Sequence, residues 1–350
     1  MSARNLDNYE PQSAPPTTRE PQPYRLGFAV KILGAGGLKT NDARRWQSGP
    51  HLRTSLELLD TAFDHLDRID VRVFRLSSST IPYGTHPDLP RLDYRRQLEE
   101  AADEVAALGR KARALGLRLS THPGQYTVLD APDPGLRAKA AADLEQDAAL
   151  LDALGQGPEA AVVVHVGGAY GDKRAALDRW ARAYDALSER ARTRVAVEHD
   201  ETSFDVDDVL ELHRRTGVRV VYDHHHHRCK PAPGLREPAA ALAAALATWP
   251  EDVRPKVHLS SPRTELRVLG KGRTTRLVAP LLDQHADFVT PWDLAELLGL
   301  LQRPADIVLE AKAKDLALLW LREQAARLFP ELAAAEERFS RRAKPGIEAV

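Results

Sequence analysis

The feature that most constrains the fold of this 350-residue chain is a repeated alternation of short apolar runs and helical patterns. Because strands that alternate with helices form a parallel sheet, eight such units in one domain's length predict an α/β fold, the (β/α)₈ TIM barrel. A doubly wound open sheet is the alternative. The runs cover residues 25–30, 71–76, 117–121, 161–166, 194–198, 218–223, 256–259 and 306–310, and the helical patterns cover 52–66, 94–115, 137–154, 173–191, 206–215 and 237–248.

The barrel domain is predicted to occupy residues 25–330. Residues 1–24 are polar and rich in proline, which predicts a disordered tail, and residues 331–350 form a C-terminal extension. Gly116, Gly155 and Gly217 each follow a helical pattern, where glycine suits the left-handed residue that ends a helix.

The composition excludes several classes of protein. The chain has 49 Lys and Arg against 50 Asp and Glu, so its net charge argues neither for nor against a nucleic-acid partner. No apolar run is long enough to span a bilayer, and no Gly-x-Gly-x-x-Gly motif indicates a nucleotide cofactor. Cys229 is the only cysteine, which rules out an internal disulfide. We therefore expect a cytoplasmic protein, and a monomer because one chain can supply every ligand described below.

Imidazoles and carboxylates follow six consecutive runs. In a barrel the carboxyl ends of the strands meet on one face, and crowded carboxylates there would repel each other unless cations neutralised them. A mixed imidazole and carboxylate set suits Zn²⁺, Mn²⁺ or Fe²⁺ better than Ca²⁺ or Mg²⁺ alone. Each residue singly could equally be a hydrogen-bonded strand end, but together they predict more than one metal, with Glu198 as the bridging carboxylate. The candidate ligands are His122, His165, Glu198, Asp223, His226, His258 and Glu310.

Two further stretches lie on the same predicted face. Asp283 and His285, two residues apart, are weaker candidate ligands. A basic stretch precedes them, which fits a phosphodiester substrate beside metals, although a solvated surface is the plainer interpretation. Its residues include Arg263, Arg267, Lys271, Arg273 and Arg276. Gln125 and Tyr126 follow His122 on a predicted turn, where they could wedge into or stack on bases.

These motifs resemble the UV damage endonuclease family, whose members are barrels similar to endonuclease IV and xylose isomerase. The resemblance covers about residue 25 to residue 315. The motifs that carry it are Arg-Leu-Gly at 25–27, Phe-Arg at 74–75, Ile-Pro at 81–82 leading to His-Pro at 86–87, His-Pro-Gly-Gln-Tyr at 122–126, His-Val-Gly-Gly-Ala-Tyr-Gly at 165–171, Glu-His-Asp at 198–200, Asp-x-x-His at 223–226, Pro-Lys-Val-His-Leu at 255–259 and Glu-Ala-Lys at 310–312.

The resemblance implies an enzyme that nicks double-stranded DNA directly 5′ to cyclobutane dimers, 6-4 photoproducts and often abasic sites, leaving a 3′-hydroxyl and a 5′-phosphate. It implies two or three divalent cations, Mn²⁺ first, with Zn²⁺, Co²⁺ or Mg²⁺ as alternatives. His122, His165 and Glu198 would hold one cation. A second would be held by Glu198, Asp223, His258 and Glu310, and a third by His226 with Asp283 and His285.

The resemblance also assigns roles to residues outside these ligand sets. His86 would contact the scissile phosphate or the attacking water, and Lys256 matches a lysine that is carboxylated in a characterised member. Gln125 and Tyr126 would probe the damaged site. Lesion or DNA contacts are further expected from Phe28, Arg263, Lys271 and Arg273.

Three points stay open in the sequence. Phe28 and Ile32 stand where family members often have Tyr and Asn near the lesion, which leaves lesion preference undecided. His225 and His227 compete with His226 as ligands. A sugar isomerase or epimerase on the same barrel would use the same ligands, and a damage-binding protein with structural metals is the third hypothesis.

Overall fold

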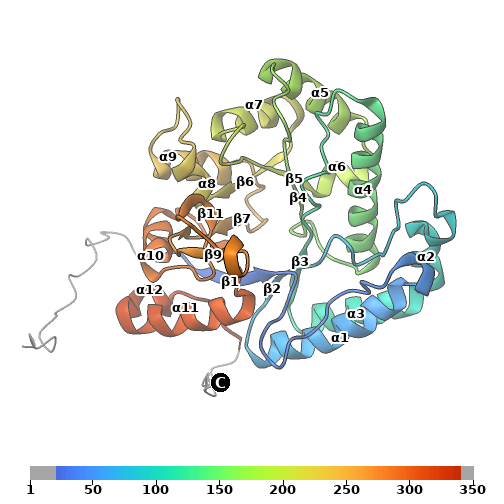
Figure 1. Cartoon of the computed structure of the whole chain (residues 1–350), viewed down its shortest axis with the longest axis horizontal. Coiled ribbons are helices and arrows are strands. Elements are labelled where there is room, and N and C mark those ends of the chain that lie inside the picture. Colours follow the sequence, from blue (N-terminus) through green and yellow to red (C-terminus); the bar gives the residue numbers. More distant parts are fainter. Residues whose placement is uncertain (1–20, 340–350) are drawn as a thin grey trace, which may run out of the picture.

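The computed structural model describes residues 21–339, and a barrel of eight parallel strands forms its centre (Figure 1). The order β3-β2-β1-β12-β7-β6-β5-β4 follows the chain around the barrel. A single bridge between Thr121 and Val162 joins β3 to β4 and closes the ring. The (β/α)₈ prediction is therefore confirmed. The strands are β1 (Tyr24–Ala29), β2 (Val73–Arg75), β3 (Arg118–Ser120), β4 (Val162–His165), β5 (Val195–Glu198), β6 (Arg219–Asp223), β7 (Lys256–Leu259) and β12 (Ala305–Leu309).

The long helices surround the strands because each buries apolar side chains against the barrel. In α1, for example, Leu52, Leu56, Leu59 and Phe63 recur every three or four residues and are all buried. The helices are α1 (Leu52–Arg68), α2 (Tyr94–Glu100), α3 (Ala102–Ala114), α4 (Pro134–Ala153), α5 (Lys173–Asp185), α6 (Glu189–Arg194), α7 (Val206–Thr216), α8 (His224–Cys229), α9 (Pro238–Leu246), α10 (Pro291–Leu300), α11 (Lys314–Leu328) and α12 (Pro330–Ala334).

Local capping explains where the helices differ from the sequence pattern. The helix expected from residue 137 begins at Pro134, because Asp133 accepts hydrogen bonds from the backbone N–H groups of the first turn. The helix expected over 94–115 is broken at Ala101, and that over 173–191 is interrupted before Ser188, which caps α6. Gly116, Gly155 and Gly217 adopt φ of +65°, +61° and +77°, as predicted for residues that end helices.

The two ends of the described chain meet at the amino-terminal end of the barrel. Tyr24, placed in the tail by its sequence, is buried and pairs with Ala305. The first part of the extension packs beside it, since Glu336 bridges to Tyr24 and the carboxylate of Glu337 accepts hydrogen bonds from Arg25 and Arg254. The rest of the predicted tail and extension, residues 1–20 and 340–350, lies outside the described residues. Within residues 21–339 no helix is long and apolar enough to cross a membrane.

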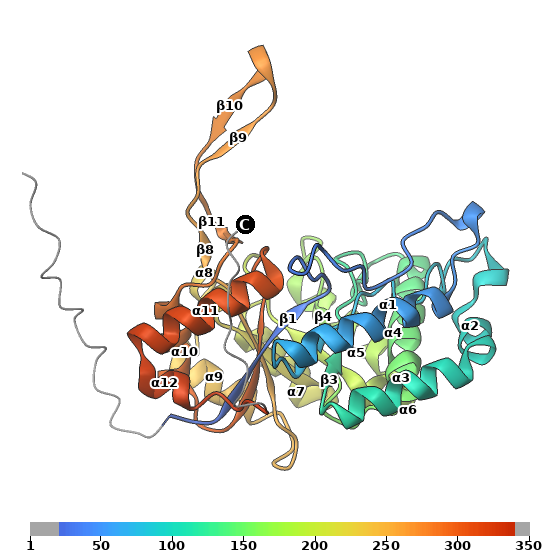
Figure 2. The same cartoon turned by 90° about the horizontal axis from the view of Figure 1, so that it is seen from below.

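Between β7 and α10 the chain forms two antiparallel ribbons instead of the loop expected from the sequence. β8 (Pro262–Arg263) pairs with β11 (Leu281–His285), and β9 (Arg267–Leu269) pairs with β10 (Arg276–Val278). The segment 262–285, hereafter the arm, projects from the carboxyl face of the barrel (Figure 2). A 3₁₀ turn, Gly272–Thr274, forms its tip.

Candidate metal centre

Three groups of His, Asp and Glu side chains gather at the carboxyl ends of the strands. Within each group the ligand atoms lie within 4.8 Å of one another. Glu198 belongs to two groups and Glu310 to two, so the groups form one continuous centre. The groups are His122, His165 and Glu198; Glu198, Asp223, His258 and Glu310; and His226, His285 and Glu310.

The register of the parallel strands brings these residues together. His165 of β4 pairs with Glu198 of β5, and Asp223 of β6 pairs with His258 of β7. Glu310 follows β12 directly, and its N–H donates to Leu259 O on β7. Strand ends that are level in register place their side chains on one face, which is why ligands far apart in sequence meet.

Glu198 occupies the middle of the centre and is fully buried. Its Oε2 lies 3.1 Å from His122 Nε2 and its Oε1 lies 2.9 Å from His258 Nδ1. Burial raises the pKa of Glu198, but the charges of His258 and His165 and the hydrogen bond from His122 outweigh it and hold the pKa well below its usual range. Glu198 is therefore an ionised carboxylate enclosed by imidazoles.

The donor set fits divalent cations. Burial also raises the pKa of Asp223 and Glu310, yet nearby cationic groups, His226 for Asp223 and Arg75 for Glu310, hold both below their usual values. Three carboxylates, the buried Glu198 and Asp223 and the largely buried Glu310, thus stay ionised close together, and Asp223 Oδ2 has no hydrogen-bond partner. An unpaired buried carboxylate oxygen is costly unless a cation or donor meets it. Hard oxygen and imidazole nitrogen donors of this kind suit Mn²⁺, Zn²⁺ and similar ions.

The structure selects His226 from the four consecutive histidines. Asp223 caps α8 and accepts a hydrogen bond from the backbone N–H of His226 at 2.8 Å, which turns the His226 ring toward the centre. Its Nε2 lies 3.4 Å from Nε2 of His285. His227 instead contacts the Arg236 carbonyl, and His225 lies beside Cys229. Neither joins a ligand group among the described residues.

Two residues that the sequence analysis did not assign support the centre. His199 Nε2 accepts a hydrogen bond from the Asp223 N–H at 3.0 Å, and burial lowers the pKa of His199 to about 3, so the ring is neutral. Arg75, at the end of β2, pairs with Glu310. Their places beside Glu198 and at a strand end are signals that the sequence already contained.

Three predicted site residues lie elsewhere than their predicted roles require, and a further predicted residue, Lys256, is buried. Asp283 is exposed and belongs to no ligand group among the described residues. Lys256, two residues before His258 on β7, is buried, which is compatible with its predicted role as a modified lysine. Burial lowers the pKa of its amine to about 8, although Asp306 opposes the shift. Phe28 is fully buried, with its ring 5.3 Å from that of Phe74, which does not fit a lesion contact.

Arg263 is the third residue whose place does not fit its predicted role. Its side chain is buried, and its guanidinium donates hydrogen bonds to the carbonyl oxygens of Glu265 and Ala279. Arg263 therefore holds the base of the arm instead of offering its charge to a phosphate. Lys271 and Arg273, by contrast, are exposed at the tip of the arm.

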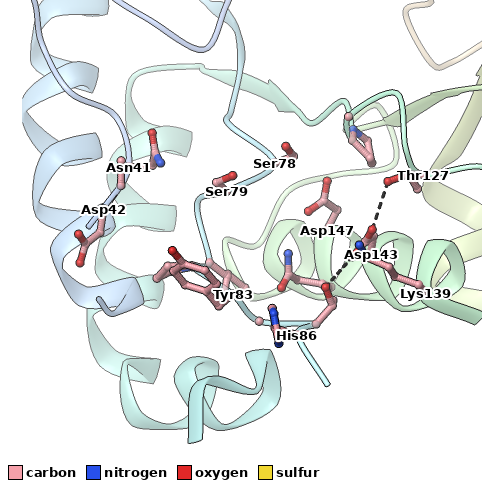
Figure 3. Close-up of a pocket in the computed structure, with 18 of the residues that line it drawn as sticks. Asn41, Asp42, Ser78, Ser79, Tyr83, His86, Thr127, Lys139, Asp143 and Asp147 are labelled. Atoms are coloured by element: carbon pink, nitrogen blue, oxygen red, sulfur yellow. Dashed lines mark hydrogen bonds between the residues drawn. The ribbon is translucent and has the colours of Figure 1, made fainter. Parts of the chain in front are cut away.

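His86 lies on the rim of a polar cavity of about 740 Å³ (Figure 3). The cavity lies between the loops that follow β1, β2 and β3, and Pro123 and Gly124, next to His122, form part of its wall. His86 is exposed, and it makes no hydrogen bond or ion pair with the ligand groups among the described residues. Deeper in the cavity wall, Asp147 is buried and burial raises its pKa to about 7.

Gln125 and Tyr126 occupy the turn after β3, beyond His122. Both are exposed, and Tyr126 is 79% exposed, which is unusual for an aromatic ring. Both side chains are thus open to solvent on the loop that carries His122.

Fold and site together define a TIM-barrel enzyme with a candidate centre for divalent cations on its carboxyl face. A family model described as UV-endonuclease UvdE matches residues 52–336. The chain belongs to this family and, like its members, is an endonuclease.

Individual relatives agree with the family assignment. The UV DNA damage endonuclease of Bacillus velezensis is 32% identical over 261 residues, which cover 73% of this chain and 75% of that protein. The enzyme of the same name from Bacillus pumilus is 32% identical over 281 residues, covering 78% and 80%.

Solved structures show the same fold. The crystal structure of SacUVDE matches with a TM-score of 0.72 at 22% identity, covering 87% of this chain and 99% of that one. Endonuclease IV from Thermus thermophilus matches with a TM-score of 0.54 at 19% identity, with the same coverage. An L-ribulose 3-epimerase reaches a TM-score of 0.51 at 15% identity, over 90% of this chain and 95% of that one. The barrel is thus shared with sugar epimerases, and the family assignment, not the fold, separates this chain from them.

Proposed function

We propose that this enzyme nicks double-stranded DNA immediately 5′ to cyclobutane dimers and 6-4 photoproducts, and at abasic sites, leaving a 3′-hydroxyl and a 5′-phosphate. The observation that carries the proposal is the continuous centre of three ligand groups in a chain of the UvdE family. Divalent cations bound there, Mn²⁺ in our proposal, would supply Lewis-acid stabilisation of the phosphate oxygens and lower the pKa of the attacking water.

The residues of the centre have distinct tasks. Glu198 and Glu310 each belong to two ligand groups, so each would be a ligand shared by neighbouring cations. His199 holds the backbone of Asp223 and thereby orients that ligand. Carboxylates that are already ionised and placed need no rearrangement as charge develops on the phosphate, which is the condition for electrostatic stabilisation of the transition state.

Other residues bind the DNA around the cut. Gln125 and Tyr126 fill the gap in the base stack at a damaged step, because such a step costs less to kink and unstack than an intact one. Lys271 and Arg273 carry positive charge at the tip of the arm for phosphate contacts. His86, on the cavity rim next to the His122 loop, contacts a phosphate near the cut strand.

Lys256 is proposed as a modified residue under the centre. Burial lowers the pKa of its amine to about 8, so part of the population carries the neutral amine that carboxylation by CO₂ requires. An intact-mass measurement under bicarbonate, compared with the Lys256→Arg variant, reads this out directly.

The test of the function is incision of an end-labelled duplex that carries one thymine dimer. With Mn²⁺ a single cut directly 5′ to the dimer is expected, and a chelator should abolish it. Parallel duplexes with an abasic site and with no lesion define the lesion range. Absence of any cut in all three duplexes with the cation present would overturn the proposal.

A further inference from the structure

The arm carries two exposed faces that the centre does not use. Cross-strand partners in the β9–β10 ribbon are Val268 with Leu277, Leu269 with Arg276, and Arg267 with Val278. Since successive side chains of a strand point to opposite faces, Val268 and Leu277 share one face and Arg267 and Arg276 share the other. The first face is therefore apolar, and the second carries Arg276 and the half-buried Arg267 beside their partners Leu269 and Val278.

Nothing in the part of the chain that the structure describes covers the apolar face. Val268 is 63% exposed and Leu277 is 66% exposed, and Leu266, two residues before Val268, is 59% exposed. The ribbon stands clear of the barrel in Figure 2. A two-stranded ribbon with no apolar layer behind it has marginal stability in water, so these side chains point to a partner.

The charges of the arm identify that partner as an anion. From Leu266 to Leu282 the chain has four cationic residues and no Asp or Glu. Those cations are Arg267, Lys271, Arg273 and Arg276. Glu265 and Asp283 border this stretch, but the charges within it are all positive. Two copies of the strip would therefore bind each other poorly, because the like charges would meet. A nucleic-acid backbone next to apolar sugar rings complements both properties.

We propose that the β9–β10 ribbon binds in the minor groove of the duplex beside the lesion and bends the DNA there. The walls of the minor groove are deoxyribose rings, which accept apolar side chains, and its edges give little sequence information, which suits an enzyme that acts on damage. The proposal rests on the proposed function for its substrate, duplex DNA, and adds where on that duplex the arm binds.

The dimensions of ribbon and groove explain why binding would bend the duplex. Two strands about 4.8 Å apart, with their side chains, are wider than a minor groove of about 6 Å. The groove must therefore open, as it does where apolar side chains insert and kink the helix. Gly272 lies nine positions after Arg263, so the arm extends roughly 30 Å from its base at about 3.3 Å per residue, the length of about nine base pairs. A binding site of this length would extend into the duplex beyond the lesion.

Binding to an undamaged duplex isolates the arm from the chemistry. For the wild type and for Arg267→Gln/Arg276→Gln, affinity is measured by fluorescence anisotropy across a salt series. The variant should bind more weakly, and the slope of log K against log salt should shrink by about two, about one per lost phosphate contact. The matched control is Arg110→Gln, which removes an exposed cation on α3, away from the arm, and should leave the slope unchanged.

The apolar face is tested with Val268→Ser/Leu277→Ser, read out by energy transfer between dyes at the two ends of the duplex. The variant should bend the duplex less and bind it at least tenfold more weakly, with the salt slope kept. Leu136→Ser, a leucine 50% exposed on α4, is the control. A stiff A-tract with a narrow minor groove, placed in the DNA beside the lesion, should lower the affinity of the wild type more than that of the variant.

The outcomes separate the arm from the proposed function. Arm variants that bind and bend DNA as the wild type does would overturn the arm proposal while incision stands. A wild type that binds and bends duplexes but cuts none would overturn the function and leave the arm in place. Sedimentation that shows a dimer converted to a monomer by Val268→Ser/Leu277→Ser, with DNA affinity unchanged, would assign the apolar face to a second copy and reject the groove.

Discussion

Two buried carboxylates in this barrel behave in opposite ways. Glu198 stands among histidines at the ends of β3 to β7, and they hold its pKa well below its usual range. Asp147, in the cavity wall on the other side of the His122 loop, has no such partners, and burial raises its pKa to about 7. Burial alone therefore does not decide whether a carboxylate ionises. Surrounding charge decides it, and a group of carboxylates that stays ionised while buried marks a place built for cations.

The largest expected effect comes from neutralising Glu198. In Glu198→Gln the shape is kept but the shared negative charge is lost, so neighbouring cations lose a common ligand. We expect incision of dimer-containing DNA to fall at least about a thousandfold, which corresponds to about 4 kcal/mol of transition-state stabilisation. Single-turnover incision measures this. Glu57→Gln, an exposed carboxylate on α1, is the control, and near-normal cutting by Glu198→Gln would contradict the bridging role.

The corresponding carboxylate-to-amide substitution at Asp147 should raise the stability of the fold. The folded state holds the Asp147 proton to pH of about 7 whereas an unfolded aspartate releases it near pH 4, so the wild type loses stability as pH rises from about 4 to about 7. Asp147→Asn removes that loss. Its free energy of unfolding should exceed that of the wild type at pH 8, by at most about 4 kcal/mol, and the gain should vanish at pH 4.

Denaturant unfolding at the two pH values measures the Asp147 effect. Asp185→Asn, an exposed aspartate on α5, should show no such difference between pH 4 and pH 8. A wild type and an Asp147→Asn variant with equal stability at pH 8 would show that the contrast with Glu198 is wrong.

Removal of cations should lower the stability of the folded protein through the centre, and should not act through the cavity around Asp147. A cation that binds only the folded state stabilises it by about 2.7 kcal/mol per site at a free concentration one hundred times its Kd. The wild type should therefore unfold at a higher temperature with Mn²⁺ than with chelator, and Glu198→Gln should show a smaller difference. Calorimetry with parallel metal analysis measures both quantities. An equal shift in the two proteins would place the stabilising cation elsewhere.

The smallest effect concerns the exposed ring beside the centre. Tyr126→Ala should weaken binding to dimer-containing DNA by roughly tenfold, because stacking of one base on an aromatic ring contributes about 1–3 kcal/mol. Metal content should not change. Tyr126→Phe keeps the ring and should bind nearly as the wild type does. Unchanged binding of damaged DNA by Tyr126→Ala in an anisotropy assay would reject the role of Tyr126 in probing the lesion.

The sequence was informative wherever the strand register alone sets a position. His165, Glu198, Asp223 and His258 end or nearly end parallel strands, so counting along each strand was enough to place them on one face. The choice among His225, His226 and His227 was beyond the sequence, because it depends on how Asp223 caps α8 and so sets the rotation of that helix.

The sequence pattern also could not predict whether Phe28 and Arg263 are buried or exposed. Phe28 alternates correctly for a strand, but only packing shows that its ring belongs to the core that the strands share with the helices. Arg263 looked like a member of a solvated basic stretch, whereas the fold of the arm turns it inward onto two carbonyl groups. Charge and spacing describe what a side chain could do, while tertiary contacts decide which neighbours it meets.

β11 has a consequence for the order of events on the enzyme. This strand carries His285, a member of the third ligand group, and two residues separate it from the ribbon that ends at Val278. A partner that holds the β9–β10 ribbon would also restrict the backbone of His285. A cation bound to His285 would in turn restrict the ribbon. If DNA fixes the ribbon as proposed and an ion binds at His285, thermodynamic reciprocity requires each to raise the affinity for the other by the same factor. On that proposal, the third cation would bind more tightly to the enzyme–DNA complex than to the free enzyme.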